Sequence, residues 1–414
     1  MTSSTLKSVV TVLFGLTYLA LAIGRIPGLR IDRAGIAMVG AVFMLSVGAL
    51  RLREAAEAVD CETIVLLFSM MVVVANLRMA GFFALVTERI SKRFSNPWAL
   101  LAVVIGLSGI LSAFLVNDIV CVALTPLVLD LAKRQRWPAV PYLVGLATAS
   151  NIGSVATITG NPQNIIIGSL SAIPYLRFAA CLAPVAIAGL VLDFAVVALM
   201  YRRLLGTRDE QTHVWTEDLP RVRVNRPLLV KSVAVTVVAV ILFFAGQPIA
   251  LVALAAASIL MLSRVRPVKV YKAIDWPLLI MFMGLFVVVR AFEVHVVHSW
   301  GLERWDALRA SPVVLLSALS VMLSNLVSNV PAVLLFKPLI GMISQQEQAW
   351  LALAMSSTLA GNLTVLGSVA NLIVVENARR AGTELSFVEY LKVGLPLTAM
   401  TLLVGMAWLV LVRY

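Results

Sequence analysis

The chain has 414 residues, of which 61% are hydrophobic and only 13% are charged, and its mean hydropathy is +0.97. Charged residues make up about a quarter of a soluble domain, so this composition excludes a water-soluble protein and predicts a surface covered mostly by lipid. The net charge of +12 does not require nucleic acid, because the basic residues form short clusters between long apolar runs. The cysteines Cys61, Cys121 and Cys181 form neither a CxxC pair nor an even framework, so no structural disulfide is expected.

The long apolar runs predict an all-α polytopic membrane protein with about ten transmembrane helices, because a bilayer core of about 30 Å needs about 20 apolar residues per helix. The runs 138–175 and 349–380 contain polar, glycine-containing stretches, which predict broken helices that line a cavity. The segments of about 97–133 and 312–340 have a polar kink at the centre and predict re-entrant hairpins. The remaining predicted crossings are 8–24, 34–50, 62–80, 177–200, 228–246, 248–263, 274–293 and 388–412.

Basic residues set the predicted orientation, because cytoplasmic loops are rich in lysine and arginine. A cytoplasmic central connector, 201–227, places the other main basic clusters on the same side and leaves both chain ends outside. These clusters lie at 25–33, 89–93, 133–136, 264–272 and 379–392. A competing interpretation of residues 1–22 as a cleaved signal peptide is disfavoured, because the first segment matches the first span of the second half.

The two halves of the chain, 1–200 and 228–414, contain matching polar motifs. Asn117 and Asn329 occupy the same position at the tips of the two predicted hairpins. A second motif is shared by the two broken helices and consists of Thr157, Gly160 and Asn164 in the first, and Thr364, Gly367 and Asn371 in the second. Because each half has an odd number of predicted crossings, the halves are expected to insert with opposite orientation, as an inverted repeat.

Polar residues at breaks in apolar helices are candidates for a solute site, because the freed backbone groups need partners inside the membrane. The alternative is that Ser, Thr, Asn and Gly only pack helices together, which is common in membrane proteins. Recurrence of the same spacing favours a shared site near the midplane, where helix N-termini also offer N–H groups. The predicted substrate-binding residues are Asn117, Thr157, Gly160, Asn161, Asn164, Ser328, Asn329, Asn362, Thr364, Gly367, Ser368 and Asn371.

Ionisable side chains within membrane segments are functional candidates, since a charge at mid-bilayer costs about 2.5–3.5 kcal/mol on insertion scales. Asp118 adjoins the first hairpin tip and is predicted to load and release a coupling proton, with a purely structural carboxylate as the competing role. Asp193 and Lys337 receive no assignment. Cys121 is a minor candidate ligand for As(III), against the more usual role of a buried cysteine as a small apolar filler. No other metal ligand set and no cofactor are predicted.

The stretch from Ala149 to Asn164, ASNIGSVATITGNPQN, resembles the signature of the ion transporter superfamily. The second copy, GNLTVLGSVAN from Gly361 to Asn371, and the tip sequence FLVND resemble the motifs of the arsenite-permease branch. The resemblance covers nearly the whole chain. It implies scaffold and transport domains, elevator-type alternating access, a homodimer through the scaffold and an option to associate with a cytoplasmic ATPase subunit. Neither hairpin tip reads Ser-Asn-Thr, which departs from the sodium-coupled dicarboxylate branch.

Together these features predict a proton-coupled secondary transporter of the bacterial inner membrane that exports arsenite or antimonite. Asp118 would repel a dianion, whereas uncharged arsenous acid offers three hydroxyls to amide and hydroxyl side chains. The alternative keeps the fold and changes the cargo to an inorganic or carboxylate anion of the citrate or sulfate type, held by helix N-termini. An intramembrane enzyme is disfavoured, because the sequence has no HExxH motif and no paired membrane aspartates. The expected partners are therefore a small inorganic solute and the lipid bilayer, without nucleic acid.

Overall fold

The computed structural model describes residues 3–23, 31–93, 96–206, 224–263, 265–297, 312–341, 343 and 345–412. Within these ranges every regular element is a helix, which confirms the all-α prediction. The basic residues predicted at 25–30 and 264, and residues 207–223 of the connector, lie outside the described residues.

The first half contains the helices α1 (Ser3–Ile23), α2 (Arg33–Ser46), α3 (Leu52–Ala58), α4 (Cys61–Ala80), α5 (Phe82–Arg93), α6 (Pro97–Phe114), α7 (Asn117–Gln135), α8 (Val140–Ser154), η1 (Ile158–Gly160), α9 (Pro162–Ser171), α10 (Tyr175–Met200) and α11 (Arg202–Leu205). The second half contains α12 (Arg226–Phe244), α13 (Ile249–Met261), α14 (Pro267–Tyr271), α15 (Trp276–His295), α17 (Pro312–Val327), α18 (Asn329–Ile340), α19 (Gln346–Ala360), η4 (Val365–Gly367), α20 (Val369–Arg380) and α21 (Phe387–Leu411). Each predicted crossing and hairpin therefore corresponds to one or more helices at the expected place in the chain.

Among the described residues, seven helices are long and apolar enough to cross a membrane: α1, α4, α6, α10, α12, α15 and α21. The predicted crossings 34–50 and 248–263 are shorter in the structure, where α2 has 14 residues and α13 has 13. At about 1.5 Å per residue each spans roughly 20 Å, which is less than the hydrocarbon core. The number of complete crossings therefore stays a prediction.

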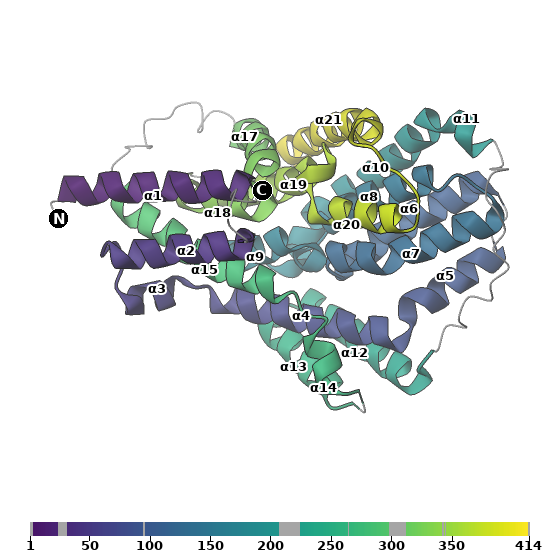
Figure 1. Ribbon diagram of the computed structural model, residues 1–414, viewed down its shortest axis with the longest axis horizontal. Helices are drawn as coiled ribbons and strands as arrows, with labels where there is room; N and C mark the ends of the chain where they lie inside the picture. Colours follow the sequence, from purple (N-terminus) through teal and green to yellow (C-terminus); the bar gives the residue numbers. More distant parts are fainter. Residues whose placement is uncertain are drawn as a thin grey trace.

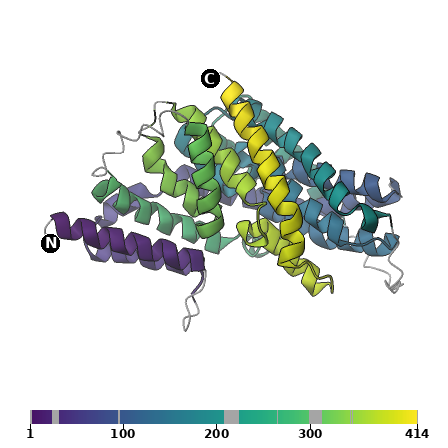
Figure 2. The ribbon, with the colours of Figure 1, turned by 90° about the horizontal axis from the view of Figure 1, so that it is seen from above.

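Helices of the first half pack against helices of the second half. α2 of the first half packs along α15 of the second, and α4 of the first half packs along α13 of the second. Within each half the hairpin packs on the broken helix, α6 on α8 in the first half and α17 on α19 in the second. Between the halves, α10 and α21 also lie against each other. Figure 1 shows α1, α2 and α15 at one end of the molecule and α6, α7 and α8 at the other, and Figure 2 shows α21 crossing the bundle obliquely.

Hydrogen bonds between helix ends show which ends lie together at the face predicted to be cytoplasmic. Lys133 Nζ donates to the carbonyl of Ala381 (3.2 Å), which joins the end of α7 to the end of α20. Asn225 N donates to the carbonyl of Ala80 (3.2 Å), which joins the start of α12 to the end of α4. Both contacts join helix ends that the basic clusters assign to one side.

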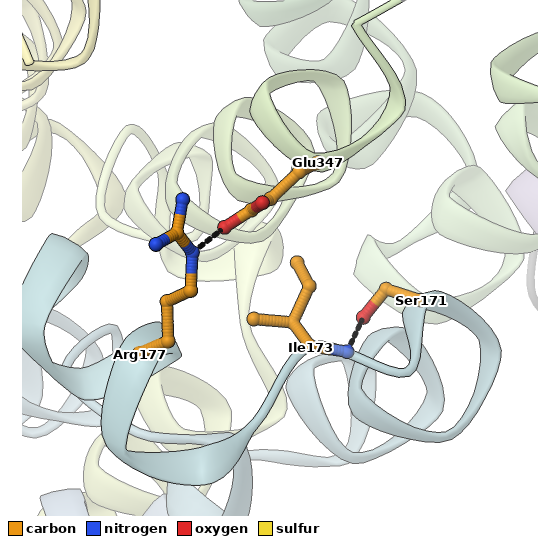
Figure 3. Close-up of polar contacts among 4 residues, drawn as sticks. All are labelled: Ser171, Ile173, Arg177 and Glu347. Atoms are coloured by element: carbon orange, nitrogen blue, oxygen red, sulfur yellow. Dashed lines mark hydrogen bonds and ion pairs between the residues drawn. The ribbon is translucent and has the colours of Figure 1, made fainter. Parts of the chain in front are cut away.

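An ion pair joins the end of the first broken-helix region to the start of the second. Arg177, near the start of α10, pairs with Glu347 in the first turn of α19 (Figure 3). In the short link before α10, Ile173 N donates to Ser171 Oγ (3.3 Å). The end of the first broken helix, α8 to α9, therefore lies close to the beginning of the second, α19 to α20.

Candidate functional site

A cavity of about 540 Å³ lies where the two hairpin tips meet the starts of α9 and α20. Both predicted tip residues, Asn117 and Asn329, line it, so the structure brings together two residues that are far apart in the sequence. The end of α1 and the starts of α2 and α15 complete the wall. The polar and charged lining residues are Asp32, Arg33, Asn117, Asp118, Gln163, Asp275, Ser328, Asn329 and Ser368.

Four of these lining residues were not predicted: Asp32, Arg33, Gln163 and Asp275. Asp32 and Asp275 are helix caps, since Asp32 Oδ1 accepts from Gly35 N (2.8 Å) and Asp275 Oδ1 accepts from Leu278 N (3.0 Å). An aspartate before an apolar run is a recognisable N-cap signal in the sequence. Their position beside the hairpin tips, however, depends on tertiary packing.

The hairpin tips hold their asparagines in well-buried positions. Asn117 begins α7, is 3% exposed, and its Nδ2 donates to Asn151 Oδ1 (3.0 Å). Its Oδ1 has no hydrogen-bond partner in the described part of the chain, which leaves one acceptor for a solute hydroxyl. Asn329 begins α18, and in the amide orientation that satisfies its neighbours its nitrogen donates to the carbonyls of Ser357 (3.1 Å) and Gly367 (3.3 Å).

Asn151, in the last turn of α8, is the centre of the buried network. Its Nδ2 donates to Asn362 Oδ1 (2.8 Å) and to Asn371 Oδ1 (3.0 Å). Its Oδ1 accepts from Asn117 Nδ2 and from Ser368 Oγ (3.0 Å each). One amide therefore joins the first hairpin tip to both ends of the second break. Asn151 belongs to the motif that resembles the superfamily signature, but it was not among the predicted site residues.

Thr358 lies on α19 at the position that corresponds to Asn151 on α8. It makes the equivalent contacts to the first break. Asn161 Nδ2 donates to Thr358 Oγ1 (3.1 Å), as Ser368 donates to Asn151. Thr358 Oγ1 in turn donates to Asn164 Oδ1 (3.5 Å), as Asn151 donates to Asn371. The matching motifs of the two halves thus bond to each other across the centre of the molecule.

Most of the other predicted site residues build the breaks and do not line the cavity. Asn164 Nδ2 donates to the carbonyls of Ser154 and Thr157 (3.0 Å each), which are freed where α8 ends. Asn371 does the same for the second break, with the carbonyls of Gly361 (2.7 Å) and Thr364 (3.0 Å). The predicted residues outside the cavity lining are Thr157, Gly160, Asn161, Asn164, Asn362, Thr364, Gly367 and Asn371.

Gly160 shows why a glycine occupies the motif. A Cβ placed on it would lie 2.2 Å from the carbonyl oxygen of Ser154, closer than any side chain can approach. The hydroxyl of the nearby Thr157 donates to the carbonyl of Ala113 in α6. Backbone segments are therefore brought together here, and the alternative interpretation of these residues as packing and capping groups describes their contacts well.

Asp118 follows Asn117 and reaches across to the second half. Its carboxylate lies within hydrogen-bonding reach of the backbone N–H of Ala370, in the first turn of α20. The positive end of the α20 helix dipole favours a nearby anion, and the carboxylate of Asp118 supplies one. Asp275, which lines the same cavity, interacts with Asp118 electrostatically.

Cys121 lies one turn beyond the tip but faces away from the cavity. Its thiol is fully buried, lies 3.1 Å from Ser150 Oγ, and is absent from the cavity lining. Within the described ranges no group of three or more His, Cys, Asp or Glu residues is arranged to hold a metal ion.

Ser328, at the second tip, has a backbone conformation that favours glycine, with φ +79° and ψ 158°. Side chains in this region carry strain of about 1–3 kcal/mol. Ser328→Gly should therefore raise the melting temperature of the purified protein in detergent, whereas Ser328→Val should lower it. A lower melting temperature for the glycine variant would contradict the conformation described for this tip.

Comparisons with known proteins show which family the chain belongs to. Residues 18–360 match the family CitMHS, described as citrate transporter. The chain is 30% identical to the silicon efflux transporter LSI3 of Oryza sativa subsp. japonica, over 95% of this chain and 96% of that protein. It is 26% identical to a Dictyostelium discoideum protein named as the transporter arsB, over 93% of this chain and 88% of that protein.

Two solved structures share the fold. The YdaH transporter of Alcanivorax borkumensis has a TM-score of 0.59 at 17% identity, over 99% of this chain and 97% of that one. MtrF of Neisseria gonorrhoeae, described with a class of antimetabolite efflux pumps, has a TM-score of 0.56 at 11% identity, over 98% and 94%. The long family match and the relative of 30% identity together place this chain among multi-pass membrane transporters, as a member of the citrate transporter family within the ion transporter superfamily.

Proposed function

We propose that the protein is a proton-coupled secondary transporter that exports arsenite or a chemically similar uncharged, hydroxylated solute. The observation that carries the proposal is the position of Asp118, whose carboxylate lines the cavity close to the start of α20. A transported anion at that helix end would lie beside the carboxylate of Asp118, which would repel it. The remaining tip groups, Asn117, Asn329 and Ser328, are amides and a hydroxyl.

The charge balance of the cavity supports an uncharged solute. Three carboxylates, Asp32, Asp118 and Asp275, face the cavity together with one guanidinium, that of Arg33. Two like charges about 4 Å apart repel by about 1 kcal/mol in water and about 4 kcal/mol at the effective dielectric constant near a protein surface. Arsenous acid avoids this repulsion and can both donate and accept hydrogen bonds. The cavity is much larger than this molecule, so we expect it to bind against the hairpin tips within a wider, hydrated vestibule.

The named relatives support the same class of cargo. The rice protein is named for silicon efflux and the Dictyostelium protein carries the name arsB. Dissolved silicon and trivalent arsenic both occur near neutral pH as uncharged hydroxylated acids. An anion such as citrate is the second candidate, because the matching family is described as citrate transporter and Arg33 gives the cavity one cation.

We further propose that the cavity faces the cytoplasm. Its wall includes Asp32 and Arg33 at the start of α2 and Asp275 at the start of α15, which adjoin loops with predicted cytoplasmic basic clusters. A solute would then enter from inside the cell and leave after a change of access, for which we propose movement of the hairpins and broken helices against the group formed by α1, α2, α4, α12, α13 and α15.

Substrate-induced thermal stabilisation of the purified protein tests the class of solute, because a ligand that binds only the folded state raises its stability. Arsenite, antimonite and silicic acid should raise the melting temperature, and citrate, sulfate and phosphate should not. Asp118→Ala, which removes the built-in carboxylate, should weaken this preference. Stabilisation of the wild type by citrate but not by arsenite would overturn the proposal in favour of the anion.

A further inference from the structure

Asp193, in the middle of α10, is a buried carboxyl that the proposed transport site does not use. Its exposed fraction is 0%, and it lies in a helix long and apolar enough to cross the membrane. Its Oδ1 lies 2.8 Å from Thr148 Oγ1 on α8. Its Oδ2 has no hydrogen-bond partner within the described residues. An ionised carboxylate here would depend on one hydroxyl, which compensates little of the desolvation cost of several kcal/mol.

The helices packed on α10 supply no cation to Asp193 in the part of the chain that the structure describes. α6 and η1 contain no ionisable side chain, and α8 contains only Tyr142. From α21, Tyr390 is close enough to interact electrostatically with Asp193, and its hydroxyl is also buried without a hydrogen-bond partner in these ranges. The other ionisable groups of packed helices are Lys392 paired with Glu389, Glu347 paired with Arg177, Lys231 on the carbonyl of Leu262, Arg226 at the first position of α12, and Arg202 and Arg203 of α11.

The hydroxyl of Thr148 links the protonation state of Asp193 to the direction of one hydrogen bond. Thr148 has one hydroxyl hydrogen and two oxygen neighbours at 2.8 Å, Asp193 Oδ1 and the carbonyl of Val144 in the preceding turn. If this hydrogen goes to Val144, as is common for threonine in helices, the Thr148 oxygen is an acceptor for Asp193. Asp193 must then be the neutral acid, whose own O–H donates to Thr148. The hydroxyl hydrogens of Thr148 and of the Asp193 acid then both have acceptors, and no charge is buried.

Thr148 also connects Asp193 to the cavity. The backbone carbonyl of Thr148 accepts from Asn362 Nδ2 (3.3 Å). Asn362 Oδ1 accepts from Asn151 Nδ2 (2.8 Å), and Asn151 Oδ1 accepts from the cavity residues Asn117 and Ser368. Hydrogen bonds therefore run from the first hairpin tip through Asn151 and Asn362 to the backbone of Thr148, whose side chain contacts Asp193.

We propose that Asp193 is a proton-binding site of the transporter, that it holds a proton in the conformation described here, and that solute in the cavity alters its hydrogen bond to Thr148. This site is distinct from Asp118, which lines the cavity itself. Infrared difference spectroscopy tests it directly, because the carbonyl stretch of a protonated carboxyl is separate from that of a carboxylate. The full chain is reconstituted in lipid, with aspartate labelled by ¹³C to assign the band in the unmodified protein.

The wild type should show a protonated aspartic acid band that shifts with the label, disappears in Asp193→Asn and persists in Asp118→Asn. Thr148→Val should move the band to higher frequency, because the acid loses its partner. If Asp193→Asn instead removes a carboxylate band, Asp193 is ionised and the proposal is wrong. If Asp193→Asn does not fold, the label and Thr148→Val still decide the outcome.

Addition of arsenite then tests the link to the cavity. A change in the Asp193 band, lost when Asn362→Leu interrupts the chain, is expected. Arsenite that raises the melting temperature without changing this band would overturn the link. If arsenite does not bind at all, the proposed substrate is wrong, while the band in the absence of solute still reports whether Asp193 carries a proton.

Discussion

Replacing Asp118 with asparagine should abolish the ability of a pH gradient to drive solute uphill, while solute exchange without a gradient continues. Asparagine keeps the shape of the side chain and an acceptor oxygen for the N–H of Ala370, but it cannot bind a proton. A pH difference of one unit supplies about 1.4 kcal/mol per proton, which corresponds to about a tenfold solute gradient. Proteoliposomes with the unmodified protein should build a gradient of this order from radiolabelled arsenite, and those with Asp118→Asn should build none.

Asp275→Asn is the matched control for this experiment. Asp275 lines the same cavity, and asparagine can still cap α15 through Leu278 N. This variant should remain driven by the pH gradient, because the lost carboxyl is not at the hairpin tip. A gradient of normal size in Asp118→Asn vesicles would remove Asp118 from the coupling mechanism, and loss of the gradient in both variants would assign the effect to cavity charge instead.

Replacing Asn151 with leucine should have the largest effect on stability. The change leaves Asn117 Nδ2, Ser368 Oγ and the amide oxygens of Asn362 and Asn371 without their bond to Asn151 in a buried region. The loss should exceed about 3 kcal/mol, since an unsatisfied buried polar group costs about 1–3 kcal/mol and four groups are affected. We expect a large fall in the melting temperature in detergent and loss of arsenite binding.

Ser368→Ala provides the comparison within the same network. It removes one donor to Asn151 and the cap on Ala370 N, and it leaves the other three bonds of Asn151 in place. Its melting temperature should therefore lie between those of the wild type and Asn151→Leu. Equal stability of Asn151→Leu and the wild type would show that this amide does not hold the two halves together.

The hairpin tips could be predicted because their signal is local. Asn117 and Asn329 each interrupt an apolar run, and an interruption in lipid needs polar partners wherever the segment packs. The division of the remaining polar residues into solute-facing and structural groups could not be predicted. Ser368 and Asn371 are close in sequence, yet one lines the cavity while the other holds the carbonyls of the break.

The charged lining was missed for a related reason. Asp32, Arg33 and Asp275 lie at helix starts near predicted cytoplasmic loops, where a charged residue is unremarkable in sequence. Their place beside Asp118 depends on α2 packing along α15 and on both meeting the hairpin tips. The charge of the cavity, which bears most on the class of solute, is therefore a property of the assembled helices.

The sequence by itself determined that this chain enters a membrane, where its helices break, and that its halves share a polar motif, because hydropathy and backbone hydrogen bonding act over short stretches of chain. Only the tertiary structure decided which polar groups meet. Asn151 bonds to Asn362 and Asn371, Asp118 reaches Ala370, and Asp193 reaches Thr148 because of helix packing between distant segments. Hydrogen bonds need donor and acceptor about 3 Å apart and charge interactions weaken with distance, so their partners are settled by the fold rather than by spacing along the chain.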